Sequence, residues 1–241
     1  MTPTKRLLLI SNSVQHGHGY LDHAEAELRS FLGGTKRVLF VPYALLDRDG
    51  YAETAQARFE RIGCALESIH RAPDPRKAAE KAEAAFIGGG NTFRLLKTLY
   101  EHRLLEVIRA RVEGGMPYIG SSAGSVVACP TIRTTNDMPI VEPPSLTSLG
   151  LIAFQLNCHY FDADPNSTHM GETREVRLRE FHEENEMPVV GIREGSMLRV
   201  EKGLVVLKGT TGGKVFRRGE SPFEIAPGSV VDPFKASGAA L

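Results

Sequence analysis

The sequence predicts an α/β fold: a mostly parallel sheet flanked by helices, with extra β-strands in the C-terminal third. Two observations carry this prediction. In the first half of the chain, short apolar runs bounded by turn residues alternate with helical patterns, an order typical of a parallel sheet. From residue 189 onward, short β-like segments are separated by turns that contain glycine.

Four apolar runs predict the parallel strands, at residues 7–10, 38–41, 85–87 and 118–119. Apolar residues at helical spacing predict helices over residues 21–31 and 104–112. Residues 130–144 form a longer irregular stretch before another apolar run at residues 154–158. Residues 173–186 then predict a helix that is heavily charged and therefore largely solvated.

The C-terminal third contains four short segments that predict strands closing one edge of the sheet: residues 189–192, 197–200, 204–207 and 214–216. No Pro/Ser-rich linker and no internal repeat interrupts the sequence. Residues 1–241 are therefore expected to form a single domain, a size at which one α/β core is common.

The amino-acid composition argues against some classes of binding partner and indicates a cellular compartment. Lys plus Arg and Asp plus Glu number 29 each, so no global field favours nucleic acid or an anionic membrane. The N-terminal apolar run is too short for a signal peptide or a membrane span. Three cysteines without C-x-x-C spacing indicate a reducing compartment, so we expect a cytoplasmic protein.

A possible nucleophile is Ser122, at the centre of the motif Gly120-Ser121-Ser122-Ala123-Gly124. A chain of this composition contains such a motif about 0.1 times by chance, so its setting matters. Here it follows an apolar strand and precedes a helix of small residues, as a nucleophile elbow does. A glycine-rich turn capped by an ordinary serine is the simpler alternative.

Ser121 and Ser125 are competing nucleophiles, but only Ser122 holds the central position of the elbow. A serine nucleophile needs a base within hydrogen-bond reach. Among the eight histidines, His159 ends the apolar run at residues 154–158, so we expect it at the C-terminal end of a strand neighbouring the nucleophile. Three other histidines, in or beside the first loop, could line the cleft but are more typical of a solvated loop: His16, His18 and His23.

Glu194 is the candidate carboxylate for orienting the base, because it occupies a strand-end turn before Gly195. Asp162 and Asp164 are alternatives close to His159 in sequence. The resulting order of serine, histidine and acid differs from the serine, acid and histidine order of α/β-hydrolases, which disfavours that fold family.

A second strand-to-helix turn contains Gly88-Gly89-Gly90 followed by Asn91 and Thr92. It lacks the motifs of phosphate-binding loops, so it gives little support for nucleotide binding. In a serine hydrolase the Gly90 N–H could instead form an oxyanion hole with the Ala123 N–H. The alternative is a merely tight turn capped by Asn91 or Thr92.

With these residues assembled, the chain resembles the α-aspartyl dipeptidases of serine peptidase family S51 from end to end. The matching stretches are residues 8–13, 88–93, 118–124, 128–141 and 171–175, and the fourteen-residue block at 128–141 is highly specific. The resemblance places the family's catalytic triad on Ser122, His159 and Glu194. It implies a fold of the class I glutamine amidotransferase type, in which cysteine replaces the elbow serine.

The resemblance further implies cleavage of dipeptides with an N-terminal aspartate, without metal or other cofactor. Arg174 matches the family's substrate-binding arginine, with Asn91 as a second substrate-binding candidate and Arg133 as the alternative cation. From its position in a charged helical segment alone, Arg174 is predicted to be an exposed arginine on a helix surface. A homodimer is compatible with the sequence.

The chain departs from the family pattern at Ser121, where an aromatic residue is common, and at Cys158, where proline is common. Neither departure removes a reacting group. Two other functions compete: an S51 peptidase of the cyanophycinase type that cleaves aspartyl-arginine isopeptides, and a catalytically silent module that binds a small anion on its glycine loops.

Overall fold

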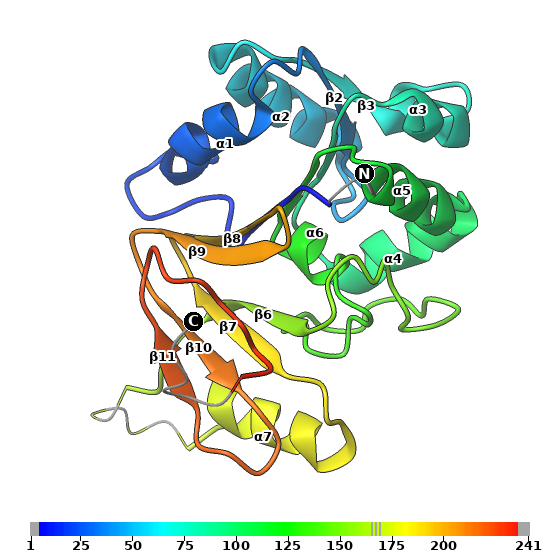
Figure 1. The fold of residues 1–241 in the computed structure, drawn as a ribbon. Coiled ribbons are helices and arrows are strands. Elements are labelled where there is room, and N and C mark those ends of the chain that lie inside the picture. Colours follow the sequence, from blue (N-terminus) through cyan, green and yellow to red (C-terminus); the bar gives the residue numbers. More distant parts are fainter. Residues whose placement is uncertain (1–4, 165, 167, 169, 236–241) are drawn as a thin grey trace.

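Two β-sheets and the helices around them make up the fold (Figure 1). The structure is a computed structural model, and it describes residues 5–164, 166, 168 and 170–235. The large sheet has seven strands in the order β3-β2-β4-β5-β1-β8-β9, and the small sheet has four in the order β11-β10-β7-β6. The predicted α/β class is therefore correct.

Five of the seven strands of the large sheet are parallel and come from the first half of the chain. These strands are β1 (Leu7–Ile10), β2 (Arg37–Val41), β3 (Ala65–Ser68), β4 (Ala85–Ile87) and β5 (Tyr118–Ser121). Two antiparallel strands, β8 (Ser196–Glu201) and β9 (Leu204–Gly209), extend the sheet beyond β1.

Alternating side chains of the parallel strands pack into two separate cores, as the two-residue period of a strand requires. On β1, Leu8 and Ile10 face the core formed with α1 (Glu25–Leu32) and α2 (Arg48–Arg61). Leu7 and Leu9 face the core formed with α3 (Pro75–Lys81), α4 (Thr92–Glu101), α5 (Leu104–Glu113) and α6 (Ala123–Val126). Figure 1 shows these two groups of helices on opposite faces of the large sheet.

The C-terminal third differs from the prediction. Only β8 and β9 close an edge of the large sheet. The other strands, β7 (Val189–Arg193), β10 (Gly213–Phe216) and β11 (Phe223–Ile225), join β6 (Gln155–Tyr160) in the separate small sheet, beside α7 (Arg174–Glu184). Strand periodicity identifies such segments but does not say which sheet they enter, because that choice depends on distant partners.

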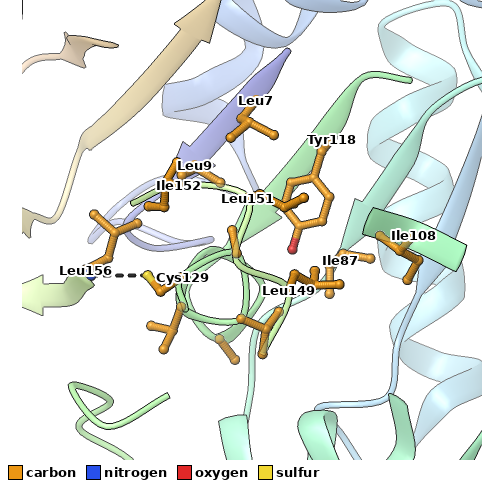
Figure 2. Close-up of a cluster of buried hydrophobic side chains, with 14 of the residues drawn as sticks. Leu7, Leu9, Ile87, Ile108, Tyr118, Cys129, Leu149, Leu151, Ile152 and Leu156 are labelled. Carbon is orange, nitrogen blue, oxygen red and sulfur yellow. Dashed lines mark hydrogen bonds between the residues drawn. The ribbon is translucent and has the colours of Figure 1, made fainter. Parts of the chain in front are cut away.

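The small sheet is attached to the large one through the core around α6. Figure 2 shows Leu156 of β6 packed among the same buried side chains as Leu7 and Leu9 of β1. The Leu156 N–H also donates to the Cys129 sulfur at 3.2 Å, the dashed line in Figure 2. This shared core fixes the position of β6 relative to the carboxyl ends of the parallel strands.

Two short helices complete the fold, the 3₁₀ turns at Asp22–Ala24 and Ile69–Arg71. None of the helices in the described part of the chain has the length and apolar character that crossing a membrane requires.

Candidate active site

The turn between β5 and α6 holds Ser122 in an unusual backbone conformation. Its φ is 49° and its ψ is −110°, a region that residues other than glycine rarely adopt. The Ser122 N–H donates to the Ile10 carbonyl at 2.9 Å, so the turn is tied to the end of β1. The strained elbow expected from the motif is present.

The two glycines of the motif allow this turn to close. A Cβ added to Gly124 would lie 2.0 Å from the Ile87 carbonyl oxygen, and one added to Gly120 would lie 2.5 Å from the Gly124 oxygen. The buried Tyr118 hydroxyl donates to that same Gly124 oxygen at 2.6 Å. The motif is therefore required by backbone-to-backbone packing.

Replacing Gly124 by alanine should destabilise the protein by about 3 kcal/mol, because a backbone carbonyl cannot yield as the end of a side chain can. Gly34→Ala is the matched control, since no atom lies within 4 Å of its added Cβ. We expect the control to change the free energy of unfolding by less than about 1 kcal/mol. Urea denaturation measures both variants, and equal midpoints would contradict this account of the elbow.

His159 lies within β6, at a β-bulge. Cys158 pairs with Ile192 and Tyr160 with Arg193, so His159 is the extra residue on its strand, and its φ is 54°. The bulge turns the imidazole toward the elbow, where Nε2 lies 3.0 Å from Ser122 Oγ. The structure brings His159 to Ser122, but its expected place was wrong, because β6 belongs to the small sheet and does not neighbour β5. Its role as the catalytic base stays a prediction.

Glu194 lies where the chain passes from β7 of the small sheet to β8 of the large sheet, in the turn that was predicted. Its Oε1 lies 2.7 Å from His159 Nδ1. A carboxylate at this distance accepts the Nδ1–H and leaves the Nε2 lone pair free to accept the Ser122 hydroxyl proton. Both side chains remain accessible, with 40% of His159 and 55% of Glu194 exposed.

Two of the competing residues, Asp162 and Ser125, bind other groups. Asp162 pairs with Arg193 at 2.5 Å and with Lys214 at 2.6 Å. Ser125 Oγ donates to the Ile10 carbonyl at 2.8 Å. All three cysteines are free and buried, and burial raises the pKa of Cys129 to about 12, so it is a thiol at neutral pH.

The glycine loop after β4 packs directly against the elbow. A Cβ on Gly89 would lie 3.1 Å from both the Ser122 Cβ and the Ser121 oxygen. The Gly89 N–H donates to the Tyr51 hydroxyl at 2.7 Å, and Gly90 follows with a φ of 130°. Ala123 is the first residue of α6, where an N–H has no acceptor within the helix. Ala123 directly follows Ser122, and Gly90 directly follows the glycine that packs against Ser122. The use of Gly90 and Ala123 as an oxyanion hole stays a prediction.

Asn91 and Thr92 begin α4, and their side chains make structural hydrogen bonds. Asn91 caps the helix by accepting the Arg94 N–H at 3.0 Å, and its Nδ2 donates to the Met138 carbonyl at 2.9 Å. Asp137 accepts the Thr92 N–H at 2.8 Å. A role of Asn91 in substrate binding stays a prediction, since these bonds leave one amide hydrogen and one lone pair.

Arg174 is the first residue of α7, behind the capping side chain of Thr173. Its guanidinium carbon lies 5.1 Å from the centre of the Phe161 ring. Burial lowers the pKa of Arg174, nearby Arg177 lowers it further, and Asp137 opposes both. Within the described residues its buried Nε has no hydrogen-bond partner, and no carboxylate forms an ion pair with it. Arg174 is therefore a partly buried cation without an ion-pair partner among the described residues.

Comparison with known proteins agrees with this geometry. The model of peptidase family S51 matches residues 7–207. The chain belongs to peptidase family S51. Within the family it is 53% identical over 223 residues to "Peptidase E" of Streptomyces coelicolor, covering 92% of each chain. It is 46% identical over 230 residues to "Probable alpha-aspartyl dipeptidase" of Drosophila melanogaster, covering 94% of this chain and 96% of the relative.

A crystal structure of a peptidase from an acI-B1 Actinobacterium has the same fold as this S51 chain. The TM-score is 0.71 at 16% identity, over 95% of this chain and 97% of the other. In the S51 chain, sequence reasoning missed four residues around the site that the structure reveals: Ser11, Asn12, Tyr51 and Asp137. Each acts on a residue at least 38 positions away along the chain, so no local pattern points to it.

Proposed function

We propose that this S51 peptidase is a serine dipeptidase that hydrolyses dipeptides with an N-terminal aspartate through an acyl-enzyme on Ser122. The observation that carries the proposal is the chain of hydrogen bonds from Ser122 Oγ to His159 Nε2 and from His159 Nδ1 to Glu194, on a strained elbow. The family membership and the names of the two relatives support the substrate class.

In the proposed reaction, Ser122 Oγ attacks the carbonyl carbon of the aspartyl residue while His159 takes the hydroxyl proton. Glu194 stabilises the imidazolium that forms, and the N–H groups of Gly90 and Ala123 stabilise the oxyanion. The imidazolium then protonates the leaving amine, which departs. Water, activated by His159, attacks the acyl-enzyme and releases aspartate.

Selectivity for aspartate requires a cation, and Arg174 is the proposed one. Its guanidinium is partly buried and forms no ion pair within the described residues, so it can hold the substrate's side-chain carboxylate with two hydrogen bonds. Asn91 is proposed as a second contact, because it directly follows Gly90 in the loop beside Ser122.

The reacting groups come from both sheets, with Ser122 after β5 and His159 in β6. We therefore propose that residues 1–241 act as one catalytic domain. The three free cysteines support a cytoplasmic location.

A panel of peptides tests the proposed substrate class: Asp-Leu, Asn-Leu, Ala-Leu and β-Asp-Arg. We expect kcat/KM for Asp-Leu to exceed that for Asn-Leu by a factor of about 100 or more, because Asn-Leu has the same shape but leaves the cation unpaired. Preference for β-Asp-Arg would indicate a cyanophycinase-type peptidase. Turnover of none of the four would contradict the proposed function.

A further inference from the structure

We propose that Ser11 and Asn12, the two residues that follow β1, are positioning residues for His159 and Glu194. The inference rests on the proposed function, because it concerns how the catalytic groups of that function are held. Both residues are completely buried, and neither has been given a role by the chemistry above.

Ser11 occupies the gap that the bulge opens between β6 and β7. Its hydroxyl oxygen accepts the His159 N–H at 2.9 Å, and its hydroxyl hydrogen is donated to the Ile192 carbonyl at 2.8 Å. The side chain of Ser11, directly after β1 of the large sheet, thus replaces a hydrogen bond that is missing between β6 and β7 of the small sheet. It satisfies a buried donor and a buried acceptor that the bulge would otherwise leave unpaired.

Asn12 supports the turn that carries Glu194. Its Oδ1 accepts the Gly195 N–H at 2.8 Å, and its Nδ2 donates to the Val14 carbonyl at 2.9 Å. Gly195 has a φ of 86°, a conformation that favours glycine. The amide of Asn12 therefore fixes the peptide immediately after Glu194 in the conformation that directs its carboxylate toward His159.

Ile10, the residue before Ser11 and Asn12, forms hydrogen bonds to the nucleophile turn and to the helix after it. The Ile10 carbonyl accepts the Ser122 N–H at 2.9 Å and the Ser125 hydroxyl at 2.8 Å. Three consecutive residues at the end of β1 therefore contact the backbone of the nucleophile turn, the base and the turn of the acid. The nucleophile follows a strand of one sheet and the base lies in a strand of the other, so their relative position depends on contacts between the sheets. The end of β1 supplies such contacts to both.

Proton transfer from Ser122 to His159 depends on their separation and orientation, and a displacement of about 1 Å can cost a factor of about 100 in rate. Without the Ser11 hydroxyl, the bulge can relax toward direct pairing of β6 with β7, which turns the imidazole away from Ser122. Substrate binding, assigned to Arg174 and Asn91, is not expected to change. The loss should therefore appear in kcat and not in KM.

Ser11→Ala tests the role of Ser11, with Ser148→Ala as its matched control. Ser148 is also buried, and its hydroxyl donates to the Val127 carbonyl at 2.7 Å, at the C-terminal end of α6. Among the described residues it makes no hydrogen bond to His159 or Glu194. We expect Ser11→Ala to lower kcat for Asp-Leu by a factor of about 30, with KM changed less than about threefold. The rate at which a fluorophosphonate labels Ser122 should fall in parallel. Ser148→Ala should lose comparable stability and keep both rates.

Two further variants complete the test. Ser11→Cys nearly preserves the volume of the side chain but weakens both of its hydrogen bonds. It tests the role of Ser11 if the alanine variant does not fold, and we expect it to lower kcat at least tenfold. Asn12→Leu removes the acceptor for Gly195 and should lower kcat about tenfold. The proposal for Ser11 would be overturned if its folded variants kept wild-type kcat, or if their loss of kcat were no larger than that of Ser148→Ala. The proposal for Asn12 would be overturned by wild-type kcat in Asn12→Leu. Failure of the proposed function is distinguishable, because the wild-type protein would then neither cleave Asp-Leu nor be labelled at Ser122.

Discussion

Replacing Ser122 by alanine is expected to reduce Asp-Leu hydrolysis by a factor of about 10⁴ or more. The hydroxyl is the proposed nucleophile, so its removal eliminates the acyl-enzyme route rather than slowing one step of it. Stability should change by less than about 1 kcal/mol, because among the described residues the side chain makes a single hydrogen bond, to His159. Initial rates on Asp-Leu, together with urea denaturation, measure the two effects.

Ser121→Ala is the matched control for this substitution. Ser121 lies next to Ser122 and is fully buried, and its hydroxyl makes no hydrogen bond among the described residues. We expect the control to stay within about threefold of wild-type activity, since no group in the proposed reaction contacts its hydroxyl. A Ser122→Ala protein with undiminished activity would remove Ser122 as the nucleophile.

The second large effect is expected at Arg174. Alanine at this position should lower kcat/KM for Asp-Leu by a factor of about 100 to 1000, because the aspartyl carboxylate loses a partly buried cation as its partner. Hydrolysis of Ala-Leu, which lacks that carboxylate, should change less than about threefold. The difference between the two substrates is the measurement, since it cancels any general loss of active enzyme.

Arg177→Ala serves as the control for Arg174. Arg177 lies on the same helix, is half exposed and pairs with Glu172 at 3.4 Å, so it is a surface charge. We expect it to leave both substrates nearly unaffected. Equal losses for Asp-Leu and Ala-Leu in Arg174→Ala would show that this arginine does not select the aspartyl side chain.

The nucleophile turn could be predicted from sequence because everything that forms it is local. Gly120, Ser122 and Gly124 lie within five residues, and their steric requirement follows from the turn itself. Glu194 was found in the same way, as a residue in a turn between two apolar strands. Four of the five parallel strands of the large sheet, β1, β2, β4 and β5, also lie close to their predicted positions.

His159 shows the limit of this reasoning. Its position after an apolar run suggested a strand end beside β5, whereas it lies within a strand of the small sheet and reaches Ser122 through a bulge. A bulge leaves no periodic signal in the sequence of one strand, because it is defined by pairing with another. The supports at Ser11 and Asn12 were missed for a related reason, since their partners lie 148 and 183 residues away.

Strand β3 of the large sheet and the neighbouring helix α2 were also absent from the prediction. Helix α2 buries mainly alanine and aromatic side chains, so its apolar stripe is weak. Strand β3 lies at the edge of the sheet and has only half-buried and exposed residues. In both cases packing against neighbours selects a structure that local hydrophobicity does not specify.

Labelling with a fluorophosphonate, followed by mass spectrometry of the digested protein, tests the central claim most directly. A fluorophosphonate reacts with a serine hydroxyl only where a base and an oxyanion site activate it. We expect one adduct per chain, on Ser122, formed more slowly in the presence of Asp-Leu and absent from the Ser122→Ala variant. An adduct on another residue, or an unlabelled protein that still hydrolyses Asp-Leu, would contradict the assignment of Ser122 as the nucleophile.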